Sequence, residues 1–168
     1  MDNVIRDRRV AADHWRLLET GEAVPSREAV IVPLATWQAQ RDALEVRTGR
    51  LGLWLEGDTD PAAIAGELSH FVLVAIHFPK FTDGRGYSAA RLLRERHGYT
   101  GELRAIGDVL RDQLPELARC GFDSFALRAG ENAEAALQSL DDLPEIYAAS
   151  TGQPVPLFRR RTATGKPA

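Results

Sequence analysis

The residues best suited to binding or chemistry lie in one stretch, from His77 to Ser88. Its glycines allow a ligand to approach the backbone closely, and free N–H groups at the start of a following helix favour an anion. We therefore expect an oxyanion, such as phosphate, sulfate, sulfite or a carboxylate, to bind here. In the alternative, the glycines only shape a βα turn and Arg85 pairs with Asp83. The candidate ligand-binding residues of this stretch are Lys80, Asp83, Gly84, Arg85, Gly86, Tyr87 and Ser88.

Three more charged residues belong to the last two expected strands: Arg104 lies within the fourth strand, Asp108 just past its end, and Arg128 closes the fifth. Guanidinium groups bind oxyanions in bidentate geometry, so Arg85, Arg104 and Arg128 could form a clamp around the same anion. The alternative is that these arginines form ordinary ion pairs, for which Glu102, Asp108 and Asp123 are available.

No complete catalytic set can be identified in the sequence. His77 could transfer protons near neutral pH, but no carboxylate or serine lies beside it in the sequence. Cys120 precedes Gly121 at an expected helix end, where the dipole disfavours a thiolate, so we expect a small buried apolar residue. The sequence contains no GxGxxG, Walker A, HExxH or GxSxG motif. Catalytic residues and cofactor therefore stay unknown, and no metal site is expected.

The elements that must position these residues follow an alternating strand and helix pattern, which predicts an α/β fold with a parallel five-stranded sheet. The third strand lacks polar alternation, as expected for a strand buried on both faces. A flavodoxin-like open sheet and half of a (βα)8 barrel both satisfy this order, and both place functional loops at the carboxyl ends of the strands. The expected strands are 29–34, 51–55, 71–77, 102–106 and 124–127.

Start and stop signals predict the helices and divide the chain into segments. Asp60 and Pro61 suit a helix start, and further helices are expected over 88–98, 112–121 and 132–140. Residues 1–28 are typical of a hairpin or cover, 29–150 form the α/β domain, and 151–168 are expected to be a flexible basic tail. Arg159, Arg160 and Arg161 could dock an acidic partner through this tail.

Composition restricts the class of protein. A chain of 168 residues with 44% hydrophobic and 27% charged residues can close one core. The net charge of -3 does not indicate nucleic-acid or membrane binding. Cys120 is the single cysteine, so an internal disulfide is excluded, and no apolar leader or membrane-spanning run is present. We expect a cytoplasmic protein, whose oligomeric state the sequence leaves open.

Three segments, 78–88, 98–110 and 119–123, resemble a bacterial family built on a domain of unknown function. Its members are labelled oxidoreductases involved in sulfite reduction and are commonly encoded beside sulfite reductase, and the resemblance extends from about Val4 to Arg161. It implies an accessory protein of assimilatory sulfite reduction that binds an anionic ligand, a redox partner, or both. The partner would be sulfite reductase or its electron donor. The alternatives are an oxidoreductase subunit with a bound flavin or other anionic cofactor, and a non-catalytic scaffold.

Overall fold

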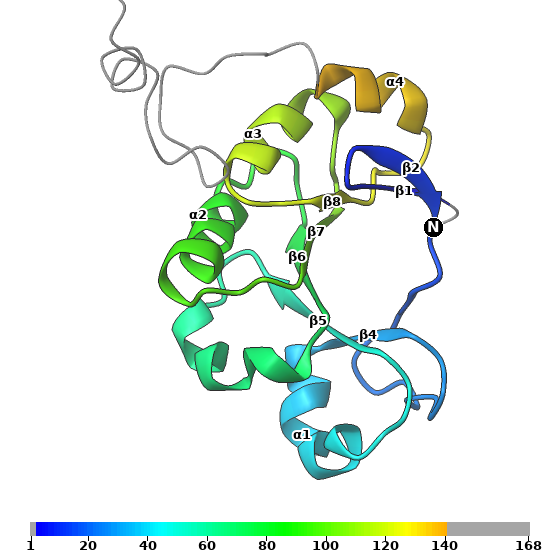
Figure 1. The fold of residues 1–168 in the computed structure, drawn as a ribbon, viewed down its shortest axis with the longest axis vertical. Helices are drawn as coiled ribbons and strands as arrows, with labels where there is room; N and C mark the ends of the chain where they lie inside the picture. Colours follow the sequence, from blue (N-terminus) through cyan, green and yellow to red (C-terminus); the bar gives the residue numbers. More distant parts are fainter. Residues whose placement is uncertain (1–2, 141–168) are drawn as a thin grey trace, which may run out of the picture.

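The protein is built around one mixed sheet with helices packed against it, as the computed structural model of residues 3–140 shows (Figure 1). The strands are β1 (Asn3–Arg6), β2 (Arg9–Ala12), β3 (Arg16–Leu17), β4 (Val30–Pro33), β5 (Leu51–Glu56), β6 (Leu73–Phe78), β7 (Glu102–Gly107) and β8 (Ser124–Phe125). The helices are α1 (Leu34–Glu45), the 3-10 helix η1 (Pro61–His70), α2 (Arg85–Arg91), the π-helical turn η2 (Leu92–Arg96), the 3-10 turn η3 (Arg111–Gln113), α3 (Leu114–Arg119) and α4 (Ala133–Ser139).

The eight strands follow the order β2-β1-β8-β7-β6-β5-β4-β3. Strands β3 to β8 are parallel, whereas β1 runs antiparallel to both β8 and β2. All five expected strands form, and they lie side by side in sequence order. A flavodoxin-like sheet reverses its strand order at a switch point, so that expectation is wrong. The sheet is instead an open, curled half barrel, and the additional strands make it mixed rather than five-stranded and parallel.

The two faces of the curled sheet have different partners. Alternate residues of β6, Val74, Ile76 and Phe78, belong to the large core that includes helix residues such as Trp37 and Leu117. We call this the outer face. The intervening residues Leu73 and Ala75 belong to a smaller cluster on the opposite, inner face, together with Ile31, Ile106, Trp15 and Trp54. Because side chains alternate along a strand, β4, β5, β6 and β7 each contribute to both clusters, which explains the unbroken apolar run of β6.

Local signals explain most element boundaries. Asp7 and Arg8 take positive φ angles of 50° and 59°, which form the tight turn of the expected β1–β2 hairpin. The side chain of Asp60 accepts a hydrogen bond from Ala62 N at 3.0 Å and begins η1. Gly98, with φ 63°, lies just after η2, as expected for a glycine that ends a helix. The helix expected from 88 begins three residues earlier, at Arg85.

The two ends of the chain differ in how they relate to the sheet and to the described residues 3–140. Within the segment 1–28, for which a hairpin or a cover is expected, β1 and β2 pair as a hairpin, which extends the sheet through the pairing of β1 with β8. The expected tail over 151–168, with Arg159 to Arg161, lies outside the described residues. None of the helices within 3–140 combines the length and apolar character needed to cross a membrane.

Candidate functional site at the mouth of the half barrel

The carboxyl ends of β5, β6 and β7 bring a histidine and a glutamate together at one edge of the sheet. Glu56 ends β5, and its register partner on β6 is His77. Both residues lie on the inner face, because they follow Trp54 and Ala75 at the two-residue period of a strand. Parallel strand ends are the usual location of functional groups in barrels and half barrels.

His77 and Glu56 form a direct polar pair. Nδ1 of His77 lies 3.1 Å from Oε2 of Glu56. The Trp54 ring contacts the imidazole edge to face, with 5.5 Å between the ring centroids. Gly107 at the end of β7 has φ 95°, and a Cβ there would lie 2.7 Å from Cδ2 of His77. A glycine is therefore required beside the imidazole, both for the backbone conformation and for space.

A cavity of about 420 Å³ opens next to this pair. Its walls are formed by Trp54 and Ile106 of the sheet and by residues 17–20, at the end of the edge strand β3. The indole N–H of Trp54 donates a hydrogen bond to the Leu18 carbonyl at 3.1 Å, which fixes one wall to the other. The complete lining is Leu17, Leu18, Glu19, Thr20, Trp54, His77 and Ile106. We call this cavity the mouth pocket.

Sequence reasoning placed His77 at the end of a parallel strand, where the structure also has it, but it did not single out Glu56 or residues 17–20. The signal for Glu56 was that each of two neighbouring parallel strands carries a polar side chain at its last or second-last position, on the same face. Residues 17–20 carried no such signal, because the two-residue strand β3 is too short to recognise in the sequence.

The stretch expected to bind an oxyanion is occupied by its own carboxylates. Nε and Nη2 of Arg85 donate to Asp83 at 2.9 and 2.6 Å, and Nη1 donates to Asp58 at 2.8 Å. Hydrogen bonding from Arg85 lowers the pKa of Asp83 to about 2. The backbone N–H of Arg85 also donates to Asp83, at 3.1 Å. An oxyanion would therefore have to displace a carboxylate, and the pairing of Arg85 with Asp83 corresponds to the alternative stated from the sequence.

The other expected residues of this stretch have separate roles. Gly86 packs against Phe78, since a Cβ there would lie 2.6 Å from the phenyl ring. Ser88 and Arg85 line a shallow groove of about 300 Å³ that also includes Asp58 and Asp60. Lys80 and Gly84 are exposed on the same edge.

Asp108 and Gln113 hold the loop after β6 in place. Asp108 accepts a hydrogen bond from Phe81 N at 3.0 Å, and the Gln113 side chain donates to the Phe81 carbonyl at 2.8 Å. The same amide contacts the Tyr87 hydroxyl at 3.2 Å. These bonds fix the backbone on both sides of Phe81, while its side chain is 51% exposed. Asp108 and Tyr87 thus act as loop supports in this structure.

The structure does not assemble Arg85, Arg104 and Arg128 into a clamp. The guanidinium of Arg104 is only 1% exposed and lies on the inner face, where Asp13 and Glu102 both pair with it. Arg104 occupies the middle of β7 rather than its end, so its side chain points to the sheet face. Arg128 pairs with Asp108 at 3.3 Å and with Glu131 at 3.5 Å. Each expected arginine therefore already has carboxylate partners.

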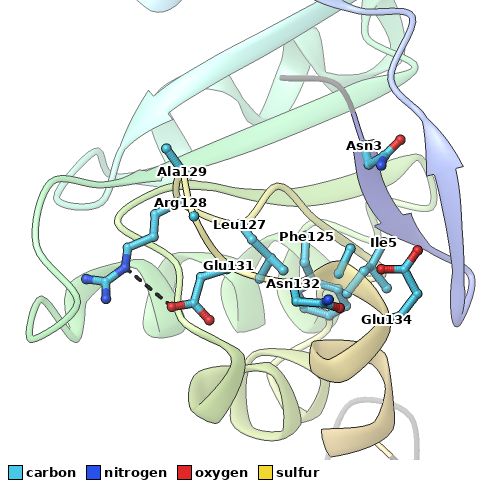
Figure 2. A pocket seen from close by; sticks show the side chains of 11 residues that line it. Asn3, Ile5, Phe125, Leu127, Arg128, Ala129, Glu131, Asn132 and Glu134 are labelled. Atoms are coloured by element: carbon cyan, nitrogen blue, oxygen red, sulfur yellow. Dashed lines mark ion pairs between the residues drawn. The ribbon is translucent and has the colours of Figure 1, made fainter.

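Arg128 also lines a second cavity, of about 680 Å³, which lies between β1, β8 and the start of α4. Figure 2 shows its walls, which come from the N-terminal strand, from Phe125 and from the turn before α4, with Arg128 directed toward Glu131. Asn132 in this wall already accepts a hydrogen bond from Ala135 N at 2.8 Å. This cavity shares no lining residue with the mouth pocket.

Cys120 and the metal-ligating residue types contribute no further site within 3–140. Burial raises the pKa of the Cys120 thiol, and the residue is 4% exposed, as expected of a small core residue. In that part of the chain, no three His, Cys, Asp or Glu side chains are grouped so that they could hold a metal ion.

Comparison with known proteins adds one match. A model of the family DUF934, described as bacterial proteins of unknown function, matches residues 52–158. This segment contains β6 to β8 and all of β5 except Leu51, and therefore both His77 and Glu56. No curated protein and no solved structure matches the chain. The chain thus belongs to DUF934, a bacterial family of unknown function.

Proposed function

We propose that the protein is an accessory protein of assimilatory sulfite reduction that binds a small ligand in the mouth pocket. The observation that carries the binding role is the pocket itself, which lies at the carboxyl ends of parallel strands and combines apolar walls with the polar His77. The link to sulfite reduction is supported by the resemblance of three segments of the sequence to proteins encoded beside sulfite reductase.

The pocket walls favour a ligand with a planar organic body over a bare oxyanion. Trp54 and Ile106 offer apolar surface, whereas the charged side chains around His77 are the carboxylates of Glu19 and Glu56. Flavin mononucleotide is a suitable probe, because it joins a planar ring to an anionic group. Sulfite and sulfate serve as probes for the oxyanion site expected at residues 83–88.

A binding experiment with matched variants tests this role. Flavin mononucleotide should raise the melting temperature of the full chain, and Thr20→Trp, which fills the pocket, should abolish the effect. Val46→Trp is the control, since Val46 is 80% exposed and does not line the pocket. If sulfite or sulfate binds instead, and Thr20→Trp does not change that binding, the loop at residues 83–88 is the site and the mouth pocket is not.

A genetic experiment tests the pathway separately. Deleting the gene in its native bacterium should slow growth on sulfate or sulfite as the sole sulfur source and leave growth on cysteine unchanged. Equal growth of the deletion strain on all three sources would contradict the role in sulfite reduction. A pull-down of sulfite reductase with the full chain distinguishes an accessory protein that docks from one that acts only on a small molecule.

A further inference from the structure

We infer that His77 is a general base, oriented by Glu56, that removes a proton from a small planar organic molecule in the mouth pocket. This inference rests on the ligand pocket of the proposed function, but it does not depend on the sulfite pathway. It adds a chemical step to what was so far a binding site.

The carboxylate of Glu56 decides which nitrogen of His77 can act. At 3.1 Å from Oε2, Nδ1 is the nitrogen that donates its proton to Glu56. Nε2 is then left as the acceptor. Among residues 3–140 no side chain or backbone group is hydrogen bonded to Nε2, so it is available to a ligand. A base whose second nitrogen is held by a carboxylate is the arrangement that proton-transferring histidines require.

The position of the imidazole is fixed on several sides. Trp54 packs edge to face against one side of the ring, and Gly107 lies close to its Cδ2 and Nε2 atoms. The ring also lines the pocket, with its side chain 31% exposed. An imidazole held in one orientation at a partly apolar cavity is positioned to accept a proton from a bound substrate, which is what general-base catalysis needs.

The walls define the substrate class. Trp54, Leu17 and Ile106 surround the pocket with apolar surface, which suits a flat and mostly uncharged molecule. Glu19 and Glu56 disfavour a negative charge on the part of the molecule that lies next to His77. In the step, Nε2 takes a proton from a C–H or N–H acid, the bonding electron pair stays on the substrate, and the protonated imidazole later returns the proton to water.

A ring-opening probe tests the base without knowledge of the natural substrate. Nitrobenzisoxazole needs only a base: its ring C–H proton goes to Nε2, the C–H electron pair forms the nitrile, and the N–O bond breaks to leave a coloured cyanonitrophenolate. The full chain should accelerate this reaction over buffer, and His77→Gln should lower the acceleration by about 100-fold. His97→Gln, at the opposite edge of the sheet, should have no effect.

Binding of unreactive nitroindazole, followed by tryptophan fluorescence, separates the possible failures. If nitroindazole binds and His77→Gln removes turnover, the inference holds. In that case Glu56→Gln should lower the turnover number without weakening the binding of nitroindazole. If nitroindazole binds but the wild type and His77→Gln react at the same rate, or the wild type is no faster than buffer, His77 is not a general base. The binding of a ligand in the mouth pocket is still supported in that case. If nitroindazole does not bind, the pocket and the base are both overturned.

Discussion

Asp13 and Arg104 form a buried ion pair that joins the exit of the N-terminal hairpin to the middle of the sheet. Both carboxylate oxygens of Asp13 accept hydrogen bonds from Nη1 of Arg104, at 3.0 and 2.9 Å. Their side chains are 5% and 1% exposed. The pair occupies the inner face of β7 and holds the chain just before residues 17–20, which form one wall of the mouth pocket. An arginine expected to bind a ligand is therefore part of the framework that shapes the site.

Removing Asp13 should destabilise the protein strongly. Asp13→Ala leaves Arg104 buried with one partner fewer, and breaking a buried pair in this way costs about 3 kcal/mol in the free energy of unfolding. Urea denaturation measures the loss. Asp112→Ala is the control, because the Asp112 side chain is 84% exposed in its pair with Arg111 and should contribute little. Equal stability of the two variants would mean that Glu102 and Ser124 alone satisfy Arg104.

Replacing Arg85 should restore the ordinary acidity of Asp83. The side-chain and backbone hydrogen bonds from Arg85 hold the pKa of Asp83 at about 2. Because this pKa is lower in the folded state, the pair contributes stability above about pH 4 and loses it as the pH falls toward 2. In Arg85→Ala the pKa should rise toward that of a free aspartate, measured by NMR titration of the carboxyl carbon. A value that stays near 2 would show that the remaining backbone contact dominates.

Tyr99 should make the protein sensitive to alkaline pH. The hydroxyl donates to the Phe71 carbonyl at 3.2 Å, and burial raises the pKa of Tyr99 above its ordinary value. The Tyr99 hydroxyl therefore ionises at a lower pH in the unfolded chain than in the folded one. The contribution of Tyr99 to stability is complete below about pH 10 and declines as the pH rises further. Tyr99→Phe should cost about 1 kcal/mol at neutral pH through the lost hydrogen bond. It should also reduce the decline of stability in alkali, followed by urea denaturation over a pH series. If the loss of stability at alkaline pH is the same in Tyr99→Phe and in the wild type, groups other than Tyr99 cause that loss.

The local elements could be predicted because their signals are local. The apolar run of β6, the Asp60 and Pro61 start of η1 and the glycine after η2 each depend on a few neighbouring residues. The hairpin turn at Asp7 and Arg8 is of the same kind. Backbone conformations, caps and the two-residue alternation of strands are decided within a few bonds, so the five parallel strands and the helices between them could be recognised from the sequence alone.

What the tertiary structure decided is which distant residues meet. Glu56 and His77 became a pair only through the parallel register of β5 and β6. Asp13 reached Arg104, 91 positions away, only because the chain leaves the hairpin at one edge of the sheet and continues into β3 at the other. The order of strands, the curl of the sheet and the burial of Arg104 depend on the summed packing of the whole core and on long-range pairing, which no local pattern encodes. For this reason the sequence singled out His77 together with arginines that are already paired, and only the tertiary structure brought His77, Glu56 and the mouth pocket together.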